Sequence, residues 1–153
     1  MVKLEVTRMS DLAIRALIEL DDRTDRLKAS ELAELLDATP AFMAQVMVPL
    51  VRQGWVDSAP GPTGGYRPTV DLGRISVLAV IEAVEGPTDT GRCVVADGPC
   101  GGERYCVLHE AWTRARTVLA QHLADTPVAA VASDISITLE PSIDQETAGA
   151  DHD

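Results

Sequence analysis

Aromatic side chains, paired cysteines and long apolar runs are all scarce in this sequence of 153 residues. Aromatic residues make up 3% of the chain, and no glycine-rich loop stands between a strand and a helix, so neither a substrate pocket nor a nucleotide site is indicated. No apolar run approaches the roughly 18 residues that cross a bilayer, and the N-terminal residues lack the apolar stretch of a signal peptide. We therefore expect a cytoplasmic protein that is not an enzyme and has neither a membrane nor a nucleotide as a partner.

The acidic charge is concentrated in the second half of the chain. Residues 1–75 carry 9 Lys or Arg and 11 Asp or Glu, whereas residues 76–153 carry 4 and 13, within a net charge of −11. Binding to nucleic acid depends on a local basic face and not on total charge. The nearly balanced first half therefore permits DNA binding.

All three cysteines lie within residues 93–109, CVVADGPCGGERYCVLH. An odd number of thiols argues against a disulfide framework, and the lack of a Cys-x2-Cys pair argues against structural zinc. Three widely spaced thiols followed by an imidazole, joined by glycines and a proline, favour an iron–sulfur cluster, either 2Fe-2S or 4Fe-4S. Redox-active or inert free thiols stay open as the alternative. The predicted metal ligands are Cys93, Cys100, Cys106 and His109.

Apolar residues at helical spacing predict four helices before the cysteines, over residues 6–20, 31–36, 40–53 and 77–85. Gly54 should end the third of these helices. Pro40 fits its first position, whereas Pro49 lies inside it and should kink it near Gln45. The expected N-caps, in chain order, are Ser10, Ser30, Thr39 and Ser76.

The second and third predicted helices, joined by a turn at residues 36–38, have the pattern of a helix-turn-helix, whose second helix enters the major groove of DNA. Other small helical pairs share this pattern. Two short extended runs, residues 55–58 and 66–69, flank a turn-rich segment and predict a β-hairpin. A helix-turn-helix followed by a hairpin is a winged helix, in which glycines would let the hairpin backbone approach a DNA groove.

A long helix is predicted over residues 106–123, beyond the winged helix. Its apolar side has nothing inside the chain to cover it, so we predict a homodimer. That side consists of Leu108, Ala111, Trp112, Ala115, Val118, Leu119 and His122.

The expected fold class is mainly α with a small β-hairpin. A winged helix-turn-helix domain spans residues 1–87 and a cysteine loop spans residues 88–106. A dimerisation helix and a following segment span residues 107–138, and a disordered acidic tail spans residues 139–153.

This order of elements resembles the iron–sulfur transcription regulators of the IscR and NsrR family. The resemblance covers about residues 3–135, and four motifs carry it: TRMSDLAIRAL at 7–17, the run 39–56 ending in LVRQGWV, GPTGGY at 61–66, and C-x6-C-x5-C-x2-H-x2-W. It implies a dimeric DNA-binding regulator, expected to be a repressor, whose operator affinity follows the state of its cluster. The signal would be nitric oxide, redox state or cluster supply. The alternative is a winged-helix adaptor that carries a cluster or thiols and binds protein in place of DNA.

The resemblance also implies two candidates for the fourth cluster ligand. The IscR type uses the histidine that follows the last cysteine, here His109, whereas the NsrR type takes an aspartate from the first helix of the other protomer, here Asp11. We expect His109, because its i, i+3 spacing from Cys106 lets both side chains face one cluster. The chain departs from the family pattern in a first cysteine gap of six residues and in Pro60, where an arginine often precedes the wing.

The expected DNA contacts fall into three groups. Base edges should be reached from the start of the third helix, by Thr39, Ala41, Phe42 and Gln45. Phosphates should be contacted by Lys3, Arg8 and Arg52. The wing should contribute Thr63, Gly64, Gly65 and Tyr66.

Overall fold

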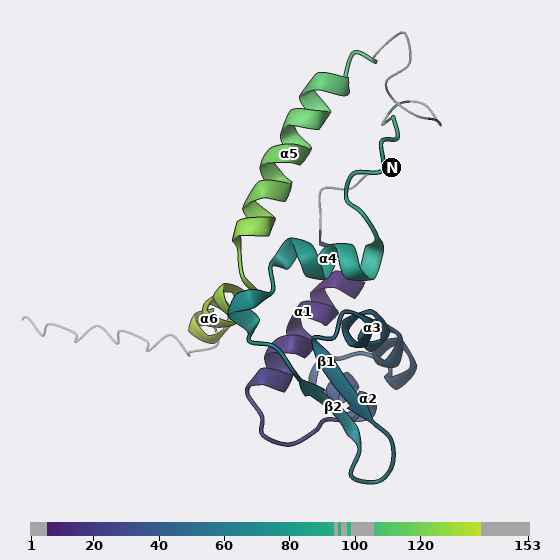
Figure 1. Cartoon of the computed structure of the whole chain (residues 1–153), viewed down its shortest axis with the longest axis vertical. Coiled ribbons are helices and arrows are strands. Elements are labelled where there is room, and N and C mark those ends of the chain that lie inside the picture. Colours follow the sequence, from purple (N-terminus) through teal and green to yellow (C-terminus); the bar gives the residue numbers. More distant parts are fainter. Residues whose placement is uncertain (1–5, 94, 96–97, 99–105, 139–153) are drawn as a thin grey trace, which may run out of the picture.

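The computed structural model of the chain describes residues 6–93, 95, 98 and 106–138 (Figure 1). The helices and strands follow in the order α1 (Arg8–Asp21), α2 (Ala29–Leu35), α3 (Pro40–Arg52), β1 (Val56–Ala59), β2 (Gly65–Pro68), the short 3-10 helix η1 (Leu72–Arg74), α4 (Val77–Glu85), α5 (His109–Asp125) and α6 (Val128–Thr138). Helices α1–α4 and the hairpin form one body, from which α5 projects away from the hairpin. The predicted fold class, mainly α with a small hairpin, is confirmed.

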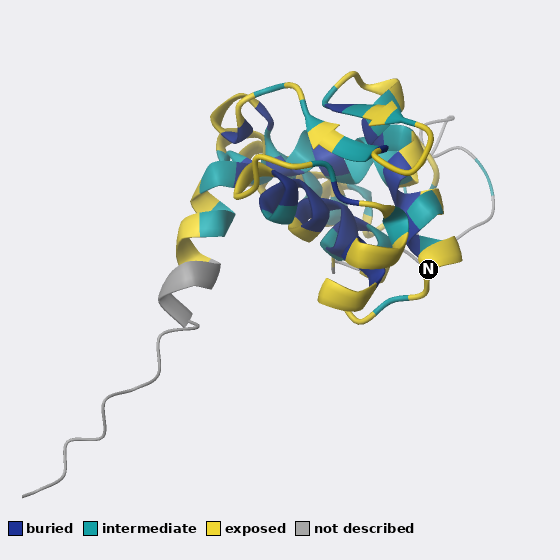
Figure 2. Ribbon diagram, turned by 90° about the horizontal axis from the view of Figure 1, so that it is seen from below, coloured by how far each residue is buried: buried dark blue, intermediate teal, exposed yellow. Residues whose placement is uncertain are grey.

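Helix α1 lies at the centre of this body and contacts α3, α4, α6, η1 and strand β2. Its apolar side is buried in the core, which appears dark blue in Figure 2. Full burial of one such aliphatic side chain contributes about 1.5–3 kcal/mol. The core also contains Val128, which is 0% exposed, so α6 returns from beyond α5 to pack on the winged helix. The core of the winged helix that the sequence predicts over residues 1–87 therefore includes a residue from beyond that range.

The predicted cap of α1 is wrong by one turn. The N-cap is Thr7, whose Oγ1 accepts a hydrogen bond from the backbone N–H of Ser10 at 3.3 Å. Ser10 lies inside the first turn, is fully buried, and its hydroxyl donates to Oε1 of Glu85 in α4. Thr7 donates to the same oxygen. The Ser10 hydroxyl therefore bonds to a side chain of α4 and does not cap α1.

The predicted cap of α2 is also wrong. The backbone N–H of Lys28 donates to Oε2 of Glu31 at 2.6 Å, which is the return half of a capping box. Ser30 is exposed within the helix, and Leu35 is 47% exposed. The other two caps, Thr39 for α3 and Ser76 for α4, are confirmed.

Helix α3 continues through Pro49 to Arg52, so the proline does not end it. A bend at that position stays a prediction. Gly54, at φ 75°, closes the helix as expected. No single described helix is long and apolar enough to span a membrane, and α2 with α3 passes that test only as a pair bent by 109°.

The wing is an antiparallel hairpin in which Val56 pairs with Pro68 and Ala59 pairs with Gly65. Arg26 links its two strands, because one guanidinium nitrogen donates to the Gly65 carbonyl at 3.0 Å and another contacts the Asp57 carboxylate. This hydrogen bond from Arg26 holds the pKa of Asp57 below its usual value.

The two wing glycines are required by the fold itself. A Cβ at Gly64 would lie 2.2 Å from the Ala59 carbonyl oxygen, and one at Gly65 would lie 2.6 Å from the Leu27 carbonyl oxygen. The sequence pattern predicts that these glycines let the wing approach DNA closely. Contact between backbone segments within the chain is sufficient to explain both.

We predict that Gly64→Ala lowers the free energy of unfolding by about 1–3 kcal/mol, because the added methyl group forces the backbone around residues 59 and 60 to move. Urea denaturation followed by circular dichroism would measure the change. The matched control is Thr63→Ala at the exposed neighbouring position, which should stay within about 0.5 kcal/mol of the parent. Equal stability of the two variants would contradict the steric argument.

Candidate functional site

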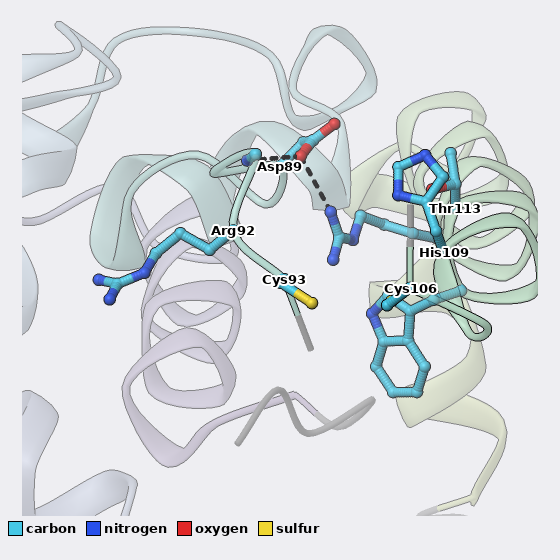
Figure 3. Close-up of a pocket in the computed structure, with 9 residues that line it drawn as sticks. Asp89, Arg92, Cys93, Cys106, His109 and Thr113 are labelled. Carbon is cyan, nitrogen blue, oxygen red and sulfur yellow. Dashed lines mark hydrogen bonds and ion pairs between the residues drawn. The ribbon is translucent and has the colours of Figure 1, made fainter. Parts of the chain in front are cut away.

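A cavity of about 220 Å³ lies between the segment that follows α4 and the start of α5. Figure 3 shows Cys93 on one side, with its sulfur toward the side that carries Cys106 and His109. The structure therefore brings together three of the four predicted metal ligands. The fourth, Cys100, lies outside the described residues. The full lining is Asp89, Gly91, Arg92, Cys93, Cys106, His109, Trp112, Thr113 and Arg116.

Two sets of hydrogen bonds hold the beginning of the cysteine loop. At the end of α4, the backbone N–H and the hydroxyl of Thr88 donate to Oε1 of Glu82, at 3.0 Å and 2.7 Å. Oδ1 of Asp89 then accepts from Arg116 of α5 and from the backbone N–H of Gly91, both at 2.9 Å. The Arg116 side chain is only 18% exposed. The loop is therefore attached to both helices that flank the cavity before Cys93 is reached.

The two candidates for the fourth ligand have different surroundings. His109 lines the cavity, and its backbone N–H donates to the Cys106 carbonyl at 3.0 Å as α5 begins. Asp11 lies in α1, where Oδ1 accepts from Nε of Arg15 at 2.8 Å. Within the described ranges, no group of three His, Cys, Asp or Glu side chains is placed to hold a metal ion. Cys93, Cys106 and His109 therefore line one cavity without forming such a group.

The side chains of helix α5 have two kinds of surroundings. His109, Trp112, Thr113 and Arg116 recur at helical spacing and line the cavity. Other apolar residues are exposed, with Val118 58% and Leu119 40% accessible, and no residue of α5 is buried. Trp112, which the sequence places on this apolar side, precedes Leu119 by two turns and also lines the cavity, so it lies where the two sets of side chains meet.

Trp112 also provides a test of whether a sulfur cluster suits this cavity. Its indole Nε1 is shielded from solvent and has no hydrogen-bond partner among the residues that the structure describes. Buried indole N–H groups usually find an acceptor. Thiolate and sulfide sulfurs are acceptors, and cysteine thiolates are the usual ligands of iron–sulfur clusters. The donor set and the unsatisfied N–H therefore both fit such a group.

The exposed face of α3 is the candidate DNA-reading surface. Ala41, Gln45, Val48 and Arg52 are all exposed, and their spacing places them on one side of the helix. Val48, at 46% exposure, was missed by the sequence analysis. It could have been found by extending the Ala41 and Gln45 spacing by one turn.

The remaining predicted base contacts have partners inside the chain. The Thr39 hydroxyl accepts the backbone N–H of Phe42 at 3.2 Å as the helix cap. Phe42 is only partly exposed and packs against the core. Both residues therefore support α3, and their contact with DNA stays a prediction.

Of the predicted phosphate contacts, one is exposed and another has a partner inside the chain. Arg52 is exposed at the end of α3. Arg8 donates from Nη2 to the Asp37 carbonyl at 2.7 Å and so supports the turn between α2 and α3, where Asp37 has φ 50°. Lys3 lies outside the described residues.

In the wing, Thr63 is exposed but Gly64 is buried. The backbone of Tyr66 bonds to Leu27 in both directions, at 3.1 Å and 2.7 Å. Gly65 sits against the Leu27 carbonyl. Of the four predicted wing contacts, Thr63 is therefore the most accessible to a DNA groove.

The sequence profile of a family described as an iron-dependent transcriptional regulator, Rrf2, matches residues 6–134. A putative HTH-type transcriptional regulator from Neisseria meningitidis is 28% identical over 144 residues, which cover 94% of this chain and 85% of that protein. The HTH-type transcriptional regulator IscR from Xenorhabdus nematophila is 33% identical over 107 residues, or 70% of this chain and 61% of that protein.

Solved structures share the fold. The structure of CymR from B. subtilis, described as a global cysteine regulator, aligns with a TM-score of 0.69 at 21% identity, over 86% of this chain and 98% of that one. The structure of IscR from T. potens aligns with a TM-score of 0.70 at 18% identity, over 90% of this chain and 93% of that one.

Proposed function

Because the chain belongs to the Rrf2 family of transcriptional regulators, we propose that it represses transcription as a homodimer whose affinity for operator DNA follows the state of an iron–sulfur cluster. The members of this family are DNA-binding regulators and not enzymes, and the same holds for this chain. A regulator that binds DNA would act in the cytoplasm. Nitric oxide, redox state and cluster supply are the candidate signals.

The observation that carries the cluster proposal is the meeting of Cys93, Cys106 and His109 at one cavity. These residues come from two segments that Asp89 and Arg116 tie together. Cys100, between them in sequence, would supply the third thiolate. When bound, the cluster would supply a centre that reacts with oxidants or nitric oxide. The residues of the chain would bind it through three thiolates and the imidazole of His109.

The cavity is connected to the DNA-reading helix α3 by a short segment of chain and then by contacts between helices. The Asp89 carboxylate that binds Arg116 lies four residues beyond Glu85 in the sequence. Glu85 accepts hydrogen bonds from Thr7 and Ser10 at the start of α1, and α1 packs directly against α3. A change in how the cysteine loop is anchored would therefore reach the orientation of α3.

The DNA proposal rests on the exposed face of α3 and on the wing beside it. Glutamine can pair with adenine through two hydrogen bonds, and small apolar side chains such as Ala41 and Val48 can contact thymine methyl groups. Arg52 at the end of the helix would contact phosphate. The alternative function, an adaptor that binds protein in place of DNA, would use the same surface. A DNA-binding experiment therefore has to distinguish the two functions.

We predict that Gln45→Ala reduces the discrimination between bases at one operator position by about 1–3 kcal/mol. Arg52→Ala should weaken binding to operator and to random DNA equally, and should reduce the slope of log affinity against log salt concentration by about 1. Operator would be selected from a random duplex library with the parent protein, and affinity measured by fluorescence anisotropy at several salt concentrations. The control is Gln53→Ala, an exposed glutamine just beyond α3. Parent-like binding by Gln45→Ala and Arg52→Ala would refute the surface assignment. A parent that binds no duplex would favour the adaptor.

We predict that alanine at Cys93, Cys100 or Cys106 abolishes the visible absorbance of anaerobically reconstituted protein and leaves its helical content unchanged. His109→Ala should shift the absorbance and the reduction potential more than Asp11→Ala does, because His109 shares the cavity with two of the thiols. The matched control is His122→Ala, an exposed histidine of the same helix. Iron and sulfide would be counted in each variant.

Two results would contradict the ligand assignment. A triple cysteine variant that keeps stoichiometric iron would exclude the thiolates as ligands. Spectra sensitive to Asp11 and indifferent to His109 would make the partner protomer's α1 the source of the fourth ligand, with nitric oxide as the leading signal. A parent that binds no iron but forms disulfides on oxidation would favour a thiol sensor.

The homodimer would cover the exposed apolar side of α5. We predict that Leu119→Glu raises the dimer dissociation constant by about tenfold or more, because it places a charge in an apolar interface at a cost of about 1.4 kcal/mol or more. Sedimentation velocity over a range of concentrations would measure the effect. Thr117→Glu adds the same charge at an exposed position of the same helix outside this side. A parent that is monomeric at all concentrations, or equal effects of both variants, would refute this interface.

A further inference from the structure

We propose that Trp112 donates a hydrogen bond from its indole Nε1 to a sulfur of the cluster, either a sulfide or a cysteine thiolate, and so stabilises the reduced form. This inference rests on the proposed function and deepens it, because it adds a positioning residue that is not itself a ligand. It begins from one observation: Nε1 of Trp112 is buried and has no hydrogen-bond partner among the described residues.

The place of Trp112 in the fold directs this N–H to the cluster site. Trp112 lies one turn beyond His109 and one turn before Arg116, and all three line the cavity with Cys93 and Cys106. The backbone of Trp112 is part of α5, where its amide N–H donates to the Leu108 carbonyl at 2.9 Å. The indole is therefore carried by the same helix that presents the imidazole.

The Asp89–Arg116 ion pair that lines this cavity does not accept a hydrogen bond from the indole N–H. The Arg116 guanidinium is a donor only, and the Asp89 oxygen Oδ1 already accepts from Arg116 and from Gly91. An N–H buried without an acceptor costs about 1–3 kcal/mol, and most buried polar groups avoid this cost. Thiolate and sulfide sulfurs are negatively charged acceptors, so a bound cluster would remove the penalty.

The bond has a chemical consequence, because hydrogen bonds to sulfur help to set the reduction potential of iron–sulfur clusters. Reduction adds negative charge to the sulfurs, so a donor such as Nε1 stabilises the reduced form more than the oxidised form. Removal of the donor should therefore lower the reduction potential. It should also speed loss of the cluster, because hydrogen bonds to charged groups are among the stronger ones.

The chain offers a matched pair for this test, because it has two tryptophans. Trp112→Phe keeps a ring in the cavity wall and removes the N–H. Trp55→Phe makes the same change where the indole packs against the core of the winged helix. Both proteins and the parent would be reconstituted anaerobically with iron and sulfide, titrated for reduction potential, and challenged with an iron chelator.

We expect a more negative reduction potential and about tenfold faster iron loss in Trp112→Phe alone, with ligand count and helical content unchanged in all three proteins. Should Trp112→Phe fail to fold, benzothienylalanine can be incorporated at position 112 in the Trp55→Phe background, since it keeps the two-ring shape and replaces the N–H with sulfur. The same shift and the same faster loss are expected.

The outcomes separate this inference from the proposed function. If the parent takes up a cluster and loss of the Trp112 N–H changes neither potential nor iron loss relative to Trp55→Phe, the inference is overturned while the cluster function stands. If the parent takes up no cluster, both are overturned.

Discussion

Burial of the apolar side of α1 is the constraint on which the other elements depend. Eight residues of this helix are buried, from Ser10 to Leu20, and α3, α4, α6 and strand β2 all contact it. Because so many elements share one helix, the position of α3 relative to α4 is set through α1. Interiors as closely packed as this transmit small displacements. The arrangement suits a regulator in which a distant site must act on a DNA-reading helix.

Glu85 gives this packing a specific polar contact. It is the last residue of α4, and its carboxylate accepts from the hydroxyls of Thr7 and Ser10 at the start of α1. The Ser10 hydroxyl is fully buried, so loss of its acceptor would leave a buried polar group unsatisfied, at about 1–3 kcal/mol. A carboxylate so placed resists separation of α1 from the end of α4, where the cysteine loop begins. It is the natural candidate for the coupling element between the two sites.

Helix α5 joins ligand binding to assembly along its length. Its first turns carry His109, Trp112 and Arg116 toward the cavity, and its later turns expose Val118 and Leu119. A homodimer formed through the later turns would hold the cavity in a fixed position relative to two DNA-binding domains. Asp89, which binds Arg116, would keep the cysteine loop against α5 as ligands are gained or lost.

Local patterns determined most of the elements. Apolar spacing located α1 to α4, the glycine-rich segment at 59–65 located the wing, and the caps Thr39 and Ser76 were identified because each bonds to a backbone N–H only three residues away. The spacing of Cys93, Cys106 and His109 predicts that they lie near one another, and all three line one cavity. These features depend on neighbours in the chain, which is why the sequence alone determined them.

Only the tertiary structure decided the pairings between distant residues. Ser10 bonds to Glu85 across 75 positions, and Arg116 bonds to Asp89 across 27. Val128 enters the core from beyond α5, and Trp112 of the apolar side also lines the cavity. A serine near a predicted helix start can cap that helix or bond elsewhere, and a tryptophan on an amphipathic helix can face either neighbour. Local sequence does not distinguish these choices, because their energies depend on which other segments the fold brings alongside.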